Sequence, residues 1–351
     1  MSLAIVLLAA GQGTRMNSKK QKILHEVGGK PMFLHLFEAA EQVSDEPPVL
    51  VVGPGEPGVR DLVGDRARYV TQAEQLGTGH ATLMAKLLLA GGPAAQVLVT
   101  YGDMPLLTAA TMRRLAKLQA ESGAAIAMLT FQGDPRSSFG RIVRATDGSV
   151  REIVEVAEAR RRPDGEELLA IREQNAGVYC FEAAFLWAHI DKLPLRQARR
   201  GPEYYLTDMV ETAVSRNRTV QAIVTTDADE CLGAGTRQEL VAVEKAFRRR
   251  ANTRWLAQGV TLVDPETIFI DPDVEIGRDT VIWPHSYLQG RTVVGEECVI
   301  GPGTLLRDAA IGDRCRLEQV HIEGTTVTAG TRLRPFSVLR REEQPVPDSE
   351  M

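Results

Sequence analysis

Hydrophobic residues in the first part of the chain alternate between short β-branched runs and longer runs with helical spacing. Strands are predicted at LAIVLL (3–8), PVLVVG (48–53), RYVTQ (68–72) and VLVTYGD (97–103), and helices at MFLHLFEAAEQV (32–43) and HATLMAKLLLA (80–90). This alternation predicts an α/β domain with a mostly parallel sheet and helices on both faces. In such sheets the ligand crevice lies at the carboxyl ends of the strands.

Two further elements follow in this region. The run GRIVRATDGSVREIVEV (140–156) predicts a hairpin around Asp147-Gly148, projecting over the crevice. Residues 238–258 are predicted to be helical because Leu240, Val243 and Phe247 recur at helical spacing. Gly259 is placed to end that helix.

After Gly259 the hydrophobic period becomes six residues. A sandwich would instead alternate at two with frequent turns. The repeat predicts a parallel β-helix, in which each turn buries its aliphatic residue against the next. We therefore expect a first domain at 1–236, a linker helix at 237–259, a β-helix at 260–340 and a disordered tail at 341–351. The aliphatic residues six apart are Ile270, Ile276, Ile282, Leu288, Val294, Ile300 and Leu306, and Ile311 comes one residue early.

Composition and charge exclude several classes of protein. The 351 residues are 44% hydrophobic and 25% charged with a net charge of -5, which suits a globular protein and gives no electrostatic footprint for nucleic acid. The apolar start lacks a basic segment and is too short to span a bilayer, so we expect no membrane association. Four cysteines far apart, with no C-x-x-C pair, argue against a zinc site and favour a cytoplasmic location.

The stretch LLAAGQGTRM (7–16) places a glycine loop directly after the first strand. Gly11 and Gly13 allow backbone amides to approach anionic oxygens closely. A dinucleotide loop needs a third glycine, whereas here Arg15 and then Lys22 follow. Two cations suit a nucleoside triphosphate, which carries about four negative charges, better than a dinucleotide. The alternative is a basic surface loop.

Two more stretches end at the same edge of the predicted sheet. In QAEQLGTGHA (72–81) the amides of Gln72 and Gln75 can pair with the edge of a pyrimidine, while Gly77 and Thr78 offer close backbone approach and a hydroxyl. In VLVTYGDMPLL, Asp103 follows a buried strand and can anchor Mg²⁺ beside substrate phosphates. A helix cap or turn is the alternative role for this aspartate.

Taken together, these motifs resemble one bacterial family across nearly the whole chain. LAAGQGTRM, KILH, QAEQLGTGHA, YGDMPLL, FGRI, IVE, QNAGVY and EYYLTD occur in this order before the hexapeptide repeats. The chain is similar to the N-acetylglucosamine-1-phosphate uridylyltransferases, which also carry a glucosamine-1-phosphate acetyltransferase. The resemblance implies a Rossmann-like nucleotidyltransferase domain followed by a left-handed parallel β-helix, magnesium dependence and a homotrimer.

The resemblance also implies roles for individual residues. Arg15 and Lys22 would hold the phosphates of UTP, and Asp103 would ligate Mg²⁺. The sugar-1-phosphate would attack the α-phosphorus in line and expel pyrophosphate. The nucleotide would contact Ala9, Ala10, Gly11, Gly13, Gln72, Gln75, Gly77 and Thr78. The sugar phosphate would contact Gly102, Gly140, Glu155, Asn175, Tyr205 and Thr207.

Several positions depart from the family pattern, among them Ala176, which replaces a threonine beside Asn175. Gly235 stands where the family has an asparagine that ligates the metal, and Asp227, Asp229, Glu230 or Thr236 are the candidate substitutes. A non-catalytic sugar-nucleotide sensor, or a transferase for another sugar phosphate, is therefore an alternative function.

The β-helix is also shorter than the family's. Because the repeats end after about four turns, we expect no acetyltransferase activity. His285 and His321 are expected to be structural or surface residues.

Overall fold

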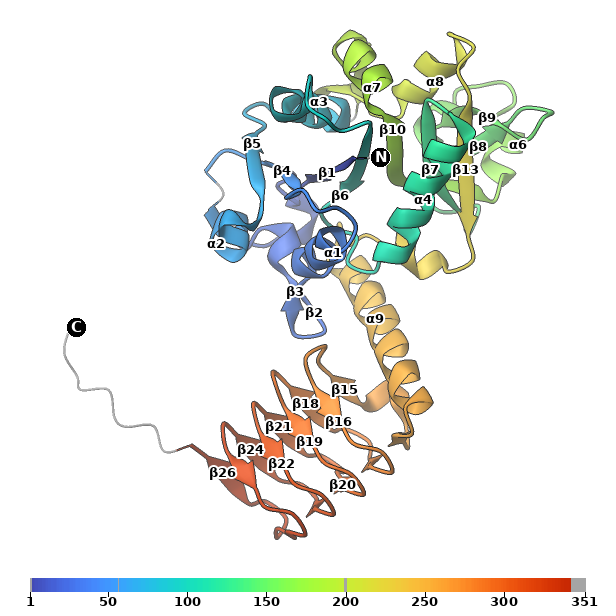
Figure 1. The fold of residues 1–351 in the computed structure, drawn as a ribbon. Helices are drawn as coiled ribbons and strands as arrows, with labels where there is room; N and C mark the ends of the chain where they lie inside the picture. The colour runs from blue at the N-terminus through green and yellow to red at the C-terminus, as the bar shows by residue number, and fades with distance from the viewer. Residues whose placement is uncertain (1, 56, 199–200, 342–351) are drawn as a thin grey trace. The chain divides into compact units, whose positions relative to one another are not determined.

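The computed structural model describes residues 2–55, 57–198 and 201–341. Apart from Arg341, the predicted tail at 341–351 lies outside the described residues. The chain divides into two compact units, Met1–His25 with Pro31–Leu240, and Glu26–Lys30 with Val241–Met351 (Figure 1). The division falls inside helix α9 (Arg237–Ala257), within the segment expected to be a linker helix.

The first unit is built on a mixed but mostly parallel sheet with the strand order β13-β7-β10-β6-β1-β4-β5. β10 runs antiparallel to both of its neighbours, while β1 is parallel to β4 and β6. This confirms the predicted α/β fold. The strands are β1 (Leu3–Leu8), β4 (Val49–Val52), β5 (Arg68–Thr71), β6 (Gln96–Tyr101), β7 (Ile126–Gln132), β10 (Glu173–Glu182) and β13 (Val220–Thr225).

Helices cover both faces of this sheet (Figure 1). Alternate residues of β1 point to opposite faces, and Ala4 and Val6 pack in the same cluster as residues of α3, α7 and α8. α1 and α4 contact each other, and α4 packs on β7. The helices of this unit are α1 (Met32–Glu41), α2 (Pro57–Val63), α3 (Gly77–Leu89), α4 (Ala109–Ser122), α5 (Val156–Ala159), α6 (Gly165–Ala170), α7 (Ala183–His189) and α8 (Asp208–Val214).

Two antiparallel hairpins extend the first unit. β8 (Arg141–Arg144) and β9 (Val150–Val154) form the predicted hairpin, and β8 also pairs with β10. β11 (Leu195–Ala198) pairs with β12 (Gly201–Tyr204) in a second hairpin. The sequence pattern did not predict this second hairpin.

The second unit contains most of α9, the short pair β2 (Glu26–Val27) and β3 (Lys30–Pro31), and a parallel β-helix. One sheet of the β-helix contains β14 (Thr261–Leu262), β17 (Val281–Ile282), β20 (Val299–Ile300) and β23 (Arg316–Leu317). Another contains β15 (Phe269–Ile270), β18 (Tyr287–Gln289), β21 (Leu305–Arg307), β24 (His321–Glu323) and β26 (Val338–Arg340). The next contains β16 (Glu275–Ile276), β19 (Val293–Val294), β22 (Ala310–Ile311) and β25 (Thr326–Val327).

The six-residue period matches the interior of this β-helix. Residues three repeats apart stack on each other, so Ile270 pairs with Leu288 and Leu288 with Leu306. Val294 pairs with Ile311, one residue early in sequence, so a coil shortened by one residue keeps the stack in register. The structure therefore confirms the left-handed β-helix that the repeat and the family resemblance predicted.

Within the described residues, the helices are all too short or too polar to span a lipid bilayer.

Candidate active site

The glycine loop leaves β1 at the carboxyl edge of the sheet. The Ala9 amide donates to the carbonyl of Val51 at 2.8 Å, which ties the start of the loop to β4. Gly13 has a φ of +62°, and a Cβ there would lie 2.3 Å from Cβ of Lys22. Glycine is therefore required at this position, both for its left-handed backbone and for the close approach of Lys22. The loop delivers Arg15 and Lys22 on two short 3-10 turns, Thr14–Met16 and Lys22–Leu24.

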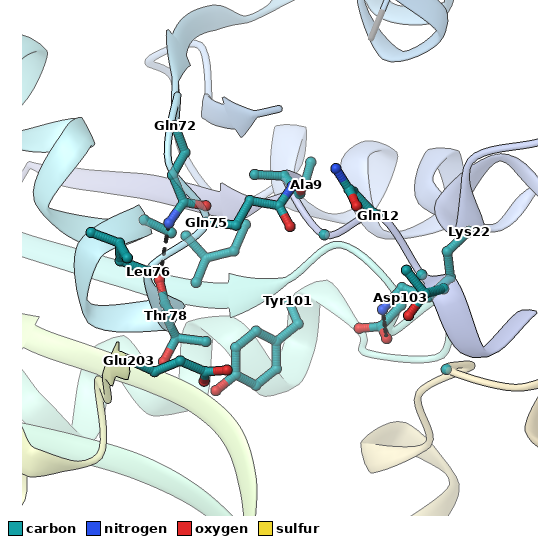
Figure 2. A pocket seen from close by; sticks show the side chains of 18 of the residues that line it. Ala9, Gln12, Lys22, Gln72, Gln75, Leu76, Thr78, Tyr101, Asp103 and Glu203 are labelled. Atoms are coloured by element: carbon teal, nitrogen blue, oxygen red, sulfur yellow. Dashed lines mark hydrogen bonds and ion pairs between the residues drawn. The ribbon is translucent and has the colours of Figure 1, made fainter. Parts of the chain in front are cut away.

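A cavity of about 720 Å³ opens at this edge. Figure 2 shows the side chains around it, with Gln72 and Gln75 at one side and Lys22 and Asp103 at the other. Its lining includes every residue that the sequence assigned to nucleotide or phosphate binding or to the metal, namely Ala9, Ala10, Gly11, Gly13, Arg15, Lys22, Gln72, Gln75, Gly77, Thr78 and Asp103. The fold thus brings together residues from three motifs far apart in sequence.

Hydrogen bonds within the protein orient the two glutamines. The amide nitrogen of Gln72 donates to the Gly77 carbonyl at 3.1 Å and lies 3.2 Å from Nδ1 of His80. Because Gln72 is buried and its amide hydrogens face these partners, its carbonyl oxygen is the group left to meet a ligand. The amide nitrogen of Gln75 donates to the Ala10 carbonyl and so ties this segment to the glycine loop.

The charged groups of the cavity are arranged around Asp103. The ammonium of Lys22 lies 2.6 Å from Oδ2 of Asp103, and Figure 2 shows the two side chains pointing toward each other. Both are only 18% and 16% exposed, so water screens this pair weakly. Arg15 also lines the cavity and is exposed, and no hydrogen bond or ion pair engages its guanidinium within the described part of the chain.

A second cavity of about 260 Å³ adjoins the first. It is lined by Gly140, Glu155 and Asn175, which the family resemblance assigned to the sugar phosphate. Gly102, Tyr205 and Thr207, assigned to the same group, are not among the described residues that line either cavity. The two cavities share four lining residues, Arg15, Tyr101, Asp103 and Gly235.

The second cavity also holds a carboxyl group in an unusual environment. Burial, and then the nearby charges of Glu158 and Asp208, raise the pKa of Glu155, while Arg141 partly opposes this. A Cβ on Gly140 would lie 3.3 Å from Oε1 of Glu155, so the glycine leaves this carboxyl room at the cavity wall.

The start of α9 closes the cavity near Asp103. Arg237 donates to the carbonyl of Met16 at 3.2 Å, which fixes this segment to the glycine loop. The Gly235 amide donates to Oε2 of Glu239 at 2.8 Å, and Glu239 lines the second cavity.

The four candidate substitutes for the missing asparagine take other positions. Thr236 caps α9 by accepting a hydrogen bond from the Glu239 amide, and Glu230 accepts one from Thr108. Asp227 accepts from the Asp229 amide. None of the four is among the described residues that line the two cavities.

The lining residues that were not selected from the sequence include Tyr101, Glu203 and Glu239. Tyr101 directly precedes the predicted Gly102-Asp103 motif and was within reach of that prediction. Glu239 stands three residues after Thr236, which is the spacing of a helix capping box. Glu203 reaches the first cavity only through the unanticipated hairpin β11–β12.

The donor set suits a hard divalent cation that also binds substrate. Groups of three or more His, Cys, Asp or Glu side chains poised for a metal do not occur among the described residues. Mg²⁺ typically binds through one or two carboxylates and completes its shell with substrate phosphates and water. Asp103, at the boundary of the two cavities, meets that requirement.

Comparisons with known proteins agree with this architecture. A model of the MobA-like NTP transferase domain matches residues 5–199, and a model of the bacterial transferase hexapeptide (six repeats) matches residues 273–308. The solved structure of CMP:2-keto-3-deoxy-manno-octonic acid synthetase with CTP covers 71% of this chain and all of its own. Its TM-score is 0.52 at 15% identity, so this likeness concerns the fold alone.

Curated relatives match over almost the full chain. The bifunctional protein GlmU of Exiguobacterium sibiricum is 39% identical over 337 residues, which are 96% of this chain and 73% of the relative. That of Trichlorobacter lovleyi is 40% identical over 348 residues, 97% of this chain and 74% of the relative. With the glycine loop, the cavity at the carboxyl edge of the sheet and the hexapeptide β-helix in place, the chain belongs to the family of the bifunctional protein GlmU.

Proposed function

We propose that the protein transfers a uridylyl group from UTP to N-acetylglucosamine-1-phosphate, giving UDP-N-acetylglucosamine and pyrophosphate. The observation that carries this proposal is the shared wall of the two cavities. A nucleotide in the first cavity and a sugar phosphate in the second would bring their phosphates together beside Arg15 and Asp103. In-line phosphoryl-type transfer needs positioning and charge stabilisation rather than a side-chain nucleophile.

We assign the roles of these residues according to their charge. Arg15 and Lys22 bind the phosphate chain and stabilise the negative charge that collects on the departing pyrophosphate. Asp103 would hold Mg²⁺, which when bound neutralises phosphate charge and orients the reacting oxygens. Amides of the glycine loop supply further hydrogen bonds to phosphate oxygens.

Base selection follows from the orientation of Gln72. Its carbonyl oxygen can accept a hydrogen bond from N3–H of uracil, because its amide nitrogen is engaged by Gly77 and His80. Cytosine presents an acceptor at N3, so the same oxygen would repel it. UTP is therefore the proposed nucleotide.

Sugar binding is assigned to the second cavity. Gly140, Glu155 and Asn175 line it, and we propose that Gly102, Tyr205 and Thr207 support the same subsite. Ala176 replaces the family's threonine beside Asn175, so the lining residues differ from the family pattern at this point. The choice of N-acetylglucosamine therefore rests on family membership.

Three properties of the whole protein complete the proposal. Family membership supports a homotrimer, which light scattering tests. Free, buried cysteines support a cytoplasmic location, which fractionation of the source cells tests. Absence of acetyltransferase activity remains a prediction, and an assay with glucosamine-1-phosphate and acetyl-CoA checks it.

The direct experiment combines the protein with UTP, N-acetylglucosamine-1-phosphate and Mg²⁺ and follows pyrophosphate release. We expect turnover, and we expect Asp103→Ala to lower kcat/KM by about 100-fold or more because the metal anchor is lost. Asp61→Ala, at an exposed position of α2, is the matched control and should leave the rate unchanged.

The second candidate function is a non-catalytic sugar-nucleotide sensor, which Gly235 favours. Tight binding of UDP-N-acetylglucosamine without pyrophosphate release from any tested sugar phosphate would replace the enzyme proposal by this one. Turnover that survives in Asp103→Ala would refute the metal assignment.

A further inference from the structure

We propose that Glu239 supplies the second protein ligand of the divalent cation, in the place left by the family's asparagine. The inference rests on the proposed function, since it concerns the same metal. The four substitutes considered from the sequence are not among the described residues that line the two cavities, whereas Glu239 lines the second one.

Neighbouring side chains fill the space beside Gly235. A Cβ built on this glycine would lie 2.4 Å from Nη2 of Arg15 and 3.0 Å from Oε2 of Glu239. The space that an asparagine side chain would enter is therefore occupied by a guanidinium and a carboxylate. An oxygen from position 239, four residues later in the chain, would replace the oxygen that the family supplies from position 235.

The segment 233–235 connects Asp103 with Glu239 at the wall of the second cavity. Consecutive amides bind the two acidic residues: Ala234 donates to the main-chain carbonyl of Asp103 at 3.3 Å, and Gly235 donates to Oε2 of Glu239 at 2.8 Å. A Cβ on Gly233 would lie 3.6 Å from Oδ2 of Asp103. Asp103 and Glu239 also line the same cavity of about 260 Å³. Two carboxylates at one small cavity are a donor set that Mg²⁺ accepts together with phosphate oxygens.

Glu239 also has a structural role, which does not compete with ligation. Its own amide donates to the Thr236 hydroxyl, as in a capping box at the start of α9, and its side chain accepts from the Gly235 amide, one residue before the cap. A carboxylate has about four acceptor sites on two oxygens. Capping occupies Oε2 and leaves Oε1, which accepts no hydrogen bond within the described chain. The cap instead fixes the carboxylate at the cavity wall.

The test measures metal binding rather than turnover. Mn²⁺ is titrated into the full chain and followed by electron paramagnetic resonance, with UDP-N-acetylglucosamine at one saturating concentration and a protein-free background subtracted. Glu239→Gln removes the charge but keeps an acceptor for the Gly235 amide, so the cap is preserved. We expect the Kd for Mn²⁺ to rise about 10 to 100-fold. Asp103→Asn should raise it at least as much, and Glu121→Gln, on the exposed end of α4, should leave it unchanged.

Two further variants separate ligation from other effects. Glu239→Asp keeps the negative charge but shortens the side chain by one methylene. If Glu239 is a ligand, this variant should bind Mn²⁺ more weakly. If the charge acts only through its general electrostatic field, the Kd for Mn²⁺ should not change. Adding Gly235→Asn to Glu239→Gln should recover part of the lost affinity, because the new amide oxygen reaches the metal and the flexible ends of its neighbours can move. Binding of UDP-N-acetylglucosamine without metal serves as the check on folding and should stay within about twofold.

The outcomes distinguish the two proposals. If the wild-type protein binds neither UTP nor UDP-N-acetylglucosamine, the proposed function fails. If it binds them with Mn²⁺, and Glu239→Gln or Glu239→Asp has the wild-type Kd for Mn²⁺, the proposed function stands and the role of Glu239 is overturned.

Discussion

At the scale of single residues, Lys22 has two possible partners, a substrate phosphate and Asp103. The sequence assigned it to phosphate, and in the structure its ammonium pairs with Asp103 at 2.6 Å. A cation there neutralises the carboxylate that a divalent metal would also use. Phosphate and Asp103 therefore compete for Lys22, and a metal and Lys22 compete for Asp103.

This competition makes a prediction for Lys22→Met. In the absence of nucleotide the variant should bind Mn²⁺ more tightly than wild type, because Asp103 no longer has a competing cation. Its affinity for UTP with Mg²⁺ should fall by about tenfold or more, since a charge-assisted contact contributes roughly 1.5–3 kcal/mol. Paramagnetic resonance gives the first quantity and calorimetry the second.

Lys19→Met provides the matched control, at an exposed position of the same loop. It should change neither affinity. Unaltered Mn²⁺ binding in Lys22→Met would contradict the competition.

At the scale of elements, the first turn of α3 holds the hairpin β11–β12 at the cavity. The Tyr204 amide donates to the carbonyl of Leu76 at 2.8 Å, and the Leu206 amide donates to the hydroxyl of Thr78 at 3.0 Å. Gly77 lies between these contacts with a φ of +90°, and a Cβ there would lie 2.7 Å from the Tyr204 carbonyl oxygen. Only glycine allows the helix start and the hairpin to meet this closely.

Gly77→Ala is therefore expected to move the hairpin and weaken UTP binding by about tenfold, in addition to the left-handed backbone cost of roughly 1–2 kcal/mol. Gly91→Ala is the control, because Gly91 has a φ of +79° and open space around its Cβ. It should lose similar stability in urea unfolding and keep its UTP affinity in calorimetry. Equal UTP affinities for the two variants would contradict the steric argument.

Elements differ in how well the sequence predicted them. β1 and the alternating strands and helices of the first unit were predicted from the hydrophobic period alone. The β8–β9 hairpin was predicted from its Asp147-Gly148 turn. The antiparallel insertion of β10 between β6 and β7 was not predicted, because a buried strand has the same composition in either direction. Hairpin β11–β12 lacked a clear alternating pattern and was missed.

For the whole molecule, the sheet domain and the β-helix bury separate sets of hydrophobic residues. Leu288 is fully buried in the β-helix between Ile270 and Leu306. Leu288→Ala should destabilise this unit by about 2–5 kcal/mol because it leaves a cavity that neighbouring coils fill only partly. In calorimetry, the unfolding transition of the β-helix unit should move to a lower temperature than in wild type.

The transition of the first unit should stay in place in this variant and should still shift upward with UTP. Val263→Ala, at an exposed position of the second unit, is expected to leave both transitions unchanged. A common shift of both transitions in Leu288→Ala would show that the units unfold together.

The sequence by itself determined the order of the elements, the change of period after Gly259 and the identity of the loop residues around the first cavity. These are local properties, since glycine positions, hydrophobic spacing and motif order are fixed by neighbouring residues. Only the tertiary structure decided that Lys22 faces Asp103, that the two cavities share a wall, and that Glu239 occupies the space beside Gly235. Lys22 and Asp103 are 81 residues apart in sequence, and the place of Glu239 depends on the direction in which the start of α9 faces. Residue spacing along the chain predicts neither.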